Sequence, residues 1–310
     1  MKSMRPADYT HRVGFQRFVM ACVASARAPS GIRVERKTLS IGNVELSYAV
    51  AGSGPAVLCI QGAGVIGNGW QPQVESLSPL FRMLTLDNRG IGTSSRGDGA
   101  LTIERMAADA LAIADAEGLD RFHLVGHSMG GLIAQEVALT ARQRVKSLAL
   151  LCTFADGARA TSLSIRMLVL ALRSRIGTRA MRRIGMIRMI MPDAYIRARS
   201  AADLAKDLGD LFGRDLADQP PIISEQLHAM SKYSAAPRLA ELTGIPTLVL
   251  SGSHDPIAPP LLGRDVVARI DGAQFVEFSD ASHALPIQCA REVNRLLLEH
   301  LMMSENNAAR

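Results

Sequence analysis

A serine set between glycines, Gly126-His127-Ser128-Met129-Gly130, is the residue pattern with the clearest chemical meaning in this chain. It follows an apolar run of strand length over residues 122–125 and precedes a helical pattern over 131–139. A serine at the tip of so tight a turn takes strained backbone angles, and larger flanking side chains would collide. The turn predicts a nucleophilic hydroxyl exposed above a sheet, with the Met129 amide and the helix N-terminus aimed at the same point. The pattern by itself also fits an ordinary glycine-rich turn, so the interpretation depends on partners for the serine.

Two downstream residues could supply those partners. A serine hydroxyl is a weak nucleophile at neutral pH, so it needs a general base, and that base needs an orienting carboxylate. Asp255 follows the apolar run 246–252, and His283 follows the run 274–278. Because the carboxyl ends of parallel strands meet at one edge of a sheet, both side chains are expected beside Ser128. We predict Ser128 as the nucleophile, His283 as the general base and then acid, and Asp255 as the orienting carboxylate.

Each assignment has an alternative. An aspartate beside a proline is often only a turn former, and a histidine before a helix is often a cap or a surface residue. Asp156 is the second candidate for the acid, because it also follows a predicted strand, over residues 145–152. His127 and His254 are weaker candidates for the base, since one lies inside the serine turn and the other adjoins Asp255.

The negative charge that develops on a substrate oxygen needs preorganised hydrogen-bond donors. Gln61-Gly62-Ala63-Gly64 follows the apolar run 56–60, and a glycine-rich turn there can offer backbone amides. We predict the amides of Ala63 and Met129 as the donors of an oxyanion hole. The alternative for this stretch is a flexible loop. It is not a phosphate-binding loop, because the Gly-Lys-Ser/Thr that such a loop needs is missing.

Together these motifs resemble the α/β-hydrolase superfamily, in its branch of lidded serine esterases, lactonases and perhydrolases. The resemblance covers about residues 34–302 and rests on the stretches 126–131, 87–94, 252–256 and 282–283. Residues 87–94, Asp-Asn-Arg-Gly-Ile-Gly-Thr-Ser, look like the family's Asp-x-Arg-Gly-x-Gly-x-Ser loop. The chain order serine, aspartate, histidine is also that of the family.

One departure concerns the predicted oxyanion loop, where Gln61-Gly62 stands in place of the family's usual His-Gly. Because the donors are backbone groups, the hole should survive this change, although the hydrogen bonds that hold the loop can differ. A serine at position 128 argues against haloalkane dehalogenase and epoxide hydrolase relatives, which have an aspartate at that point.

The elements that must position these residues alternate between apolar strands and helices. Strands are predicted over residues 33–39, 44–51, 56–60, 81–86, 122–125, 145–152, 246–250 and 274–278, and helices over 102–119 and 284–302. This alternation predicts an α/β-hydrolase fold with a mostly parallel sheet and helices on both faces. We expect the core over 33–155 and 235–303, a helical cap over 156–234 inserted after the sixth strand, and a C-terminal tail over 304–310.

The predicted cap is rich in arginine and in apolar residues. Ten arginines between residues 159 and 199 accompany a single acid, Asp193. Twelve apolar residues are interleaved with them: Leu168, Val169, Leu170, Leu172, Ile176, Met181, Ile184, Met186, Ile187, Met189, Ile190 and Met191. They would either line an apolar substrate site or pack the cap's own core. The arginines would form a solvated face or a docking site for an acidic carrier protein or an anionic membrane surface.

The N-terminal residues 1–32 are expected to form an amphipathic helical segment. Phe15, Phe18, Val19, Cys22 and Val23 fall on one helical stripe, which would pack on the body of the protein or at a homodimer interface. A marginal secretion signal is the alternative. Four widely spaced cysteines without metal-ligand spacing favour a reducing cytoplasm and no metal site.

The bulk composition bounds the function. The chain has 310 residues, 48% of them hydrophobic, and no apolar run of 18 residues, which predicts a globular protein without a transmembrane helix. A net charge of +6 without a basic and aromatic stripe does not indicate nucleic-acid binding. We predict a cofactor-free serine hydrolase that cleaves a carboxylic ester of a small or medium apolar acyl substrate. The alternatives are C–C bond hydrolysis, perhydrolase or haloperoxidase chemistry with the same triad, and a non-catalytic binding protein.

Overall fold

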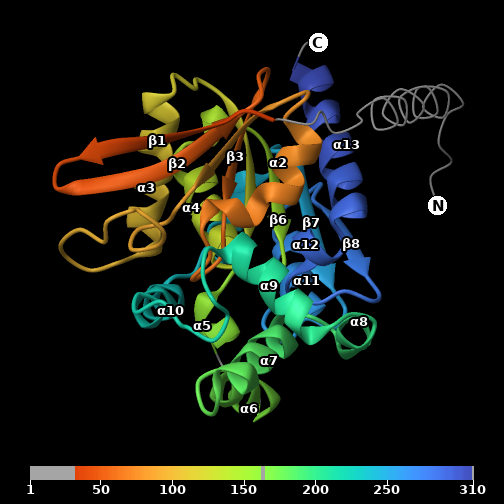
Figure 1. The fold of residues 1–310 in the computed structure, drawn as a ribbon. Helices are drawn as coiled ribbons and strands as arrows, with labels where there is room; N and C mark the ends of the chain where they lie inside the picture. The colour runs from red at the N-terminus through yellow and green to blue at the C-terminus, as the bar shows by residue number, and fades with distance from the viewer. Residues whose placement is uncertain (1–31, 162–164, 309–310) are drawn as a thin grey trace, which may run out of the picture.

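A single eight-stranded sheet lies between two layers of helices in the computed structural model, which describes residues 32–161 and 165–308 (Figure 1). The strands are β1 Val34–Ile41, β2 Val44–Ala51, β3 Ala56–Ile60, β4 Arg82–Leu86, β5 Phe122–His127, β6 Val145–Leu151, β7 Thr247–Gly252 and β8 Gln274–Phe278. They lie in the order β1-β2-β4-β3-β5-β6-β7-β8. Only the pairings β1–β2 and β2–β4 are antiparallel, so the predicted mostly parallel sheet is confirmed.

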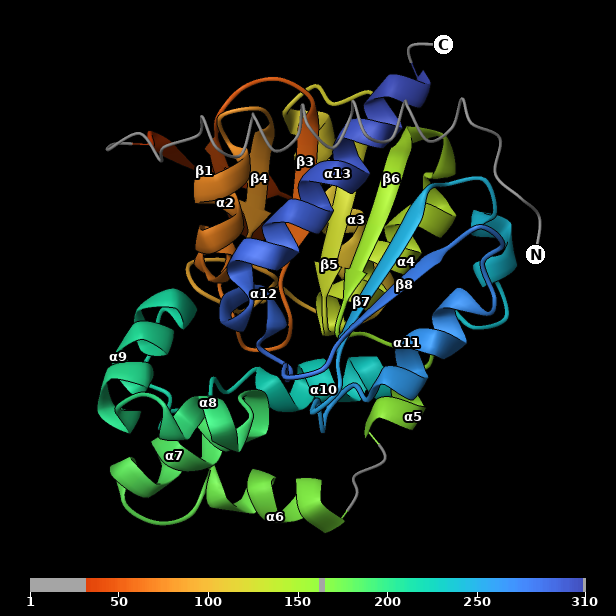
Figure 2. The ribbon, with the colours of Figure 1, turned by 90° about the vertical axis from the view of Figure 1, so that its right-hand side faces the viewer.

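The helices cover both faces of the sheet, as predicted. In Figure 2, α2 Gln71–Leu77, α12 Leu285–Gln288 and α13 Ala290–Ala308 lie in front of the strands, and α3 Ile103–Ala116 and α4 Met129–Thr140 lie behind them. With both faces covered, the central strands are expected to be buried and mostly apolar. All residues of β3 are buried, and β5 is buried up to its last residue, His127. This buried centre holds rigid the strand ends from which the candidate site residues project.

The closing helix predicted over residues 284–302 differs from the structure in two ways. It is broken between α12 and α13 at Cys289, whose backbone is not helical. It also extends to Ala308, so residues 304–308 are helical, whereas a tail was expected from 304. The extra turn is held to the sheet by Glu305, which bonds Lys146 of β6 at 2.7 Å and His123 of β5 at 2.8 Å. Such long-range contacts are not visible in the local sequence pattern.

Between β6 and β7 the chain forms the helices α5 Gly157–Thr161, α6 Ile165–Arg173, α7 Arg179–Ile190, α8 Asp193–Arg197, α9 Ala201–Phe212 and α10 Ile223–Lys232. The two ends of this interval are hydrogen-bonded to each other. Asp156 and Ser234 form an antiparallel bridge, and the Ala235 amide donates to the Ala155 carbonyl at 2.8 Å. The insert therefore begins and ends at neighbouring points beside the carboxyl ends of the strands. Its helices lie below the sheet in Figure 2.

Buried histidines make the stability of this fold depend on pH. Burial lowers the pKa of His300, on α13, from 6.5 to about 4, although its Nε2 bonds the Leu148 carbonyl at 3.2 Å. The unfolded chain takes up this proton near pH 6.5, while the folded protein does so only near pH 4. Neutral His300 therefore makes its full contribution to the free energy of unfolding above pH 6.5. This contribution falls by about 1.4 kcal/mol per pH unit as the pH is lowered from 6.5 to about 4.

We expect the free energy of unfolding to fall between pH 7 and pH 4.5, measured by urea denaturation at each pH. His300→Gln keeps a donor for the Leu148 carbonyl and removes the titration, so its stability should fall by about 2 kcal/mol less over that interval. Equal losses in the two proteins would contradict the assignment to His300.

Candidate active site

Ser128 stands at the turn between β5 and α4 with φ +54° and ψ −121°, a conformation that side-chain-bearing residues rarely adopt. Glycines on either side make the turn possible. A Cβ atom added at Gly126 would lie 2.4 Å from the Gly130 carbonyl oxygen, and one added at Gly130 would lie 2.1 Å from the Ile60 carbonyl oxygen. The predicted strand, turn and helix are thus present, and the turn lifts the serine hydroxyl above the carboxyl end of β5.

The structure brings the three predicted site residues into one hydrogen-bonded row. His283 Nε2 lies 2.9 Å from Ser128 Oγ, and His283 Nδ1 lies 2.8 Å from Asp255 Oδ2. Asp255 follows β7 and His283 follows β8, so neighbouring parallel strands deliver both side chains to the edge where β5 ends. The row therefore joins a hydroxyl, an imidazole and a carboxylate in the order that general-base catalysis requires.

The carboxylate at the end of this row is held ionised. Its second oxygen, Asp255 Oδ1, accepts the amides of Ile257 at 2.8 Å and Ala258 at 2.9 Å. Burial alone would raise the pKa of Asp255, but the charge and hydrogen bond of His283, with these two amides, hold it below its usual range. The ionised carboxylate fixes the His283 tautomer that has its proton on Nδ1 and leaves Nε2 free to accept the serine proton.

The predicted oxyanion loop approaches the serine closely. A Cβ atom at Gly62 would lie 3.0 Å from Ser128 Cβ. The Gln61 carbonyl accepts the Asn88 side-chain amide at 3.0 Å, and Gln61 Oε1 accepts the Gly62 amide at 3.1 Å. Within residues 32–161 and 165–308, neither the Ala63 amide nor the Met129 amide has a hydrogen-bond acceptor. Both predicted donors are therefore unengaged next to Ser128.

The alternative site residues lie in other settings. The Asp156 carboxylate accepts the Ala158 amide at 3.0 Å at the start of α5 and has no hydrogen bond to His283 among the described residues. His254 is exposed, and its carbonyl accepts the Ser282 hydroxyl at 3.2 Å. His127 is engaged with the His283 carbonyl, 2.8 Å from its Nε2, and its burial lowers its pKa to about 3. It is therefore a neutral structural histidine whose Nε2 carries the proton.

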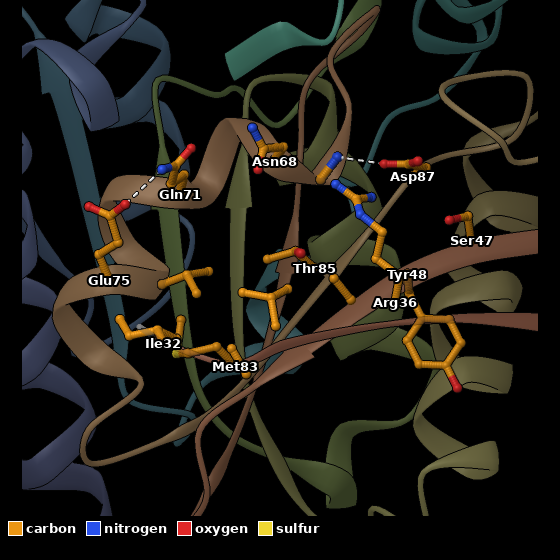
Figure 3. Close-up of a pocket in the computed structure, with 15 residues that line it drawn as sticks. Ile32, Arg36, Ser47, Tyr48, Asn68, Gln71, Glu75, Met83, Thr85 and Asp87 are labelled. Carbon is orange, nitrogen blue, oxygen red and sulfur yellow. Dashed lines mark hydrogen bonds between the residues drawn. The ribbon is translucent and has the colours of Figure 1, made fainter. Parts of the chain in front are cut away.

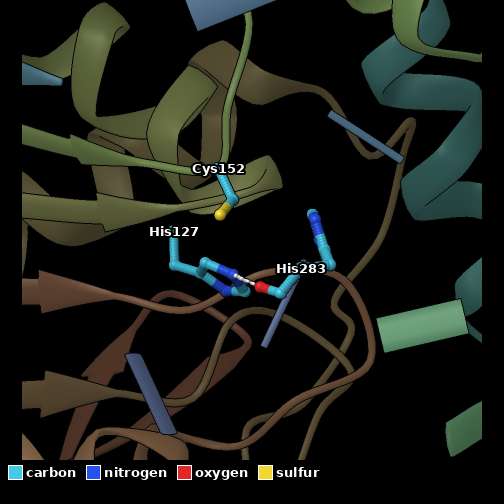
Figure 4. A group of neighbouring side chains, drawn as sticks. All are labelled: His127, Cys152 and His283. Atoms are coloured by element: carbon cyan, nitrogen blue, oxygen red, sulfur yellow. Dashed lines mark hydrogen bonds between the residues drawn. The ribbon is translucent and has the colours of Figure 1, made fainter. Parts of the chain in front are cut away.

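His127 and His283 also form a compact cluster with Cys152, shown in Figure 4, in which one potential ligand atom from each side chain lies within 4.8 Å of the others. The hydrogen bonds above engage both nitrogens of His283 and the Nε2 of His127, and His127 Nδ1 lies 3.3 Å from Gln61 Oε1. Burial raises the pKa of the Cys152 thiol well above its usual range, so it stays protonated beside Asp255. The cluster is part of the packing around the candidate triad, and its atoms are not disposed as free metal ligands.

A cavity of about 690 Å³ opens over Ser128 and His283. Its apolar walls come largely from the helices between β6 and β7, with Met167, Ala171, Met186, Met189, Ile190, Phe212, Ile223 and Leu227 among them. Met186 and Met189, two members of the predicted apolar set, thus line the cavity. Ile187, Ile190 and Met191 also pack with Leu204 and Leu208 in a small core of these helices, so both roles proposed for the apolar set occur.

Several apolar residues of α6, of α7 and of the segment between them instead face solvent. The exposed ones are Leu168, Val169, Leu172, Ile176, Met181 and Ile184. Some arginines nearby have acidic partners: Arg179 pairs with Asp215 and Asp218, and Arg183 pairs with Asp215. Docking of an acidic carrier or an anionic membrane on this surface stays a prediction, as does a homodimer. The N-terminal stripe from Phe15 to Val23 lies outside the described residues.

A second cavity of about 800 Å³ lies away from the candidate triad, against β1, β2, β4 and α2 (Figure 3). Its polar lining includes Arg36, Thr85 and Asp87. Asp87 Oδ1 accepts the Gly67 amide at 2.7 Å, which ties the loop over residues 87–94 to the start of the helix before α2. Within this cavity, Asp87 thus holds the 87–94 loop in place.

Some residues around the site were not singled out in the sequence. Cys152 has φ +47° at the end of β6, and Gln226 and Arg214 contact the Gln61–Gly64 loop from the helical insert. Asn88, which donates to the Gln61 carbonyl, was also not singled out. It lies within the 87–94 motif, and that position is the only local sequence signal for it. The contacts of Gln226 and Arg214 with the loop join residues remote in sequence, which no local pattern reveals.

The sequence model of the α/β hydrolase fold family matches residues 55–288. The chain therefore belongs to this family. A curated relative from Azorhizobium caulinodans, provisionally named carbamate hydrolase RutD, is 27% identical over 269 residues, which cover 83% of this chain and 95% of the relative. No helix among residues 32–161 and 165–308 is long and apolar enough to cross a membrane.

Two solved structures show the likeness in three dimensions. The enol-lactonase of Burkholderia xenovorans is 26% identical with a TM-score of 0.72, and the match covers 86% of this chain and all of that one (100%). A malate-bound thermophilic esterase from Thermogutta terrifontis is 26% identical with a TM-score of 0.71, and the match covers 87% and 99%. The chain is thus an α/β hydrolase related to proteins named for several reactions.

Proposed function

We propose that this protein is a serine hydrolase that cleaves carboxylic esters of small or medium apolar acyl groups. The observation that carries the proposal is the row Ser128–His283–Asp255, which opens into an apolar cavity. A hydroxyl 2.9 Å from an imidazole whose far side is held by an ionised carboxylate has the arrangement needed to attack a carbonyl carbon.

In the proposed reaction, His283 takes the Ser128 proton as Oγ bonds to the carbonyl carbon of the ester. The electron pair of the carbonyl moves to its oxygen, and the amides of Ala63 and Met129 stabilise that negative charge. When the intermediate collapses, the C–O bond to the alcohol breaks, and His283 gives its proton to the leaving oxygen. Water then attacks the acyl-enzyme by the same route, which releases the acid and restores Ser128.

The cavity supports the substrate class. Its volume of about 690 Å³ is in the range of small-molecule sites, and its walls are mainly aliphatic side chains and methionines. Such walls favour an apolar acyl group and adapt to varied shapes through methionine. The names of the esterase and of the enol-lactonase describe this bond type, an open or a cyclic carboxylic ester.

A substrate panel tests this proposal. The purified protein is offered p-nitrophenyl acetate, butyrate and octanoate, a lactone, a carbamate, a vinylogous diketone, and peroxide with a carboxylic acid. We expect the highest kcat/KM on an ester or lactone of short to medium chain, together with labelling by a fluorophosphonate probe. A preference for the diketone or for perhydrolysis would assign the triad to another reaction, and a protein inert to the probe would indicate a binding role.

A further inference from the structure

The cap has a direct connection to the loop that forms the proposed oxyanion hole. Gly64, the last residue of that loop, has both of its backbone polar groups bonded to cap side chains. Its amide donates to Gln226 Oε1 at 2.9 Å, and its carbonyl accepts Arg214 Nε at 3.2 Å. Gln226 lies on α10 and Arg214 just beyond α9, so the bonds join segments about 150 and 162 residues apart in the chain.

These contacts are built into the packing and are not surface encounters. The Gln226 side chain is fully buried, with 0% of its surface exposed. Gly64 has φ +71°, a conformation that favours glycine, and a Cβ atom there would lie 2.7 Å from Ile223 Cδ1 on α10, so the loop and the cap are in close contact at this residue. Arg214 also donates to the Asp218 carbonyl, which anchors its guanidinium within the cap.

The Ala63 amide lies between two residues, Gly62 and Gly64, whose amides are both hydrogen-bonded. Upstream of Ala63, the Gly62 amide is held by Gln61 Oε1, and the Gln61 carbonyl is held by Asn88. Downstream, Gly64 is held by Gln226 and Arg214. Ala63 is half-buried and lines the cavity over Ser128, so its free amide, held between fixed neighbours, is available to an acceptor in that cavity.

We propose that Gln226 and Arg214 are positioning residues that fix the Ala63 amide for transition-state stabilisation, so that the cap sets the catalytic rate as well as covering the substrate. The inference rests on the proposed function, since it assigns the Ala63 amide to the oxyanion. It also accounts for the tolerance of Gln61 where the family usually has histidine, because part of the loop's support comes from the cap. A shift of about 1 Å in a donor is enough to reduce a rate by about 100-fold.

The test is a set of matched glutamine and arginine variants assayed on p-nitrophenyl butyrate. Gln226→Met and Arg214→Met should each lower kcat by about 10- to 100-fold and change KM by less than about threefold. Gln226→Glu keeps an acceptor oxygen and should recover part of the loss. Arg199→Met is the control, because Arg199 is also an arginine of the cap, but it bonds the Asp207 carboxylate at 2.8 Å and is not among the residues that line the cavity. It should keep a near-normal kcat.

A second readout separates positioning from a general loss of structure. A trifluoromethyl ketone forms a tetrahedral oxyanion with a serine nucleophile, so its inhibition constant should rise in parallel with the fall in kcat. Folded Gln226 and Arg214 variants with normal kcat, or with reduced kcat and unchanged ketone affinity, would overturn the inference. So would an effect confined to KM, which a cap that only holds substrate would produce. A wild-type protein that neither turns over esters nor binds the ketone would refute the proposed function instead.

Discussion

Ser128→Ala should abolish ester hydrolysis, with a fall in kcat of about 10⁵- to 10⁶-fold, to the rate of an enzyme that only binds its substrate. Without Oγ no acyl-enzyme can form, and His283 Nε2 loses the group that lies 2.9 Å away. The assay is hydrolysis of p-nitrophenyl butyrate, together with covalent labelling by a fluorophosphonate and mass measurement of the adduct. Labelling should vanish with activity, because both need the same oxygen.

A matched serine gives the control for this prediction. Ser251, in β7, is also buried, but its hydroxyl has no hydrogen-bond partner among the described residues. Ser251→Ala should retain hydrolysis and labelling. Both variants should keep the wild-type circular dichroism spectrum, since neither removes a contact that holds the sheet. Undiminished hydrolysis by folded Ser128→Ala would rule out this residue as the nucleophile.

The candidate triad can be predicted from the sequence because each of its residues is marked by the short stretch of chain around it. Each of the three residues follows an apolar strand, and the geometry of a parallel sheet brings strand ends together without further instruction. The glycines beside Ser128 are equally local signals, because they are required by the turn itself. The same reasoning predicted the eight strands along the chain and placed the helical insertion after β6, but it did not predict α2 or the helix over Pro260–Val267.

What the sequence could not predict depends on packing between distant segments. Helical periodicity in the insert indicated helices, but it did not show that Leu168 and Leu172 would face solvent while Met167 lines the cavity. The contact of Gln226 with Gly64 joins two residues with no shared motif. The last turn of α13 likewise forms because Glu305 reaches β5 and β6, a contact that a local pattern cannot reveal.

Asp255→Asn should lower kcat by about 10³- to 10⁴-fold while leaving KM for p-nitrophenyl butyrate nearly unchanged. The neutral amide cannot stabilise the imidazolium that forms when His283 takes the serine proton. An asparagine NH₂ directed at Nδ1 would also favour the tautomer with its proton on Nε2, which cannot accept from Ser128. Fluorophosphonate labelling should slow as well, because it depends on the same activated oxygen.

Asp156→Asn is the matched control, because Asp156 was the other candidate for the acid. Its carboxylate accepts the Ala158 amide at the start of α5, and an asparagine oxygen can accept the same bond. Activity should therefore change by less than about threefold, within what a surface substitution usually does. The two variants each remove one negative charge from a loop that follows one of two adjacent strands, β6 and β7. A difference in kcat between them therefore reflects where the carboxylate lies and not the loss of charge itself. If Asp156→Asn showed the large loss and Asp255→Asn the small one, the acid would belong to the loop after β6, and the hydrogen bond between Asp255 and His283 would have only a structural role.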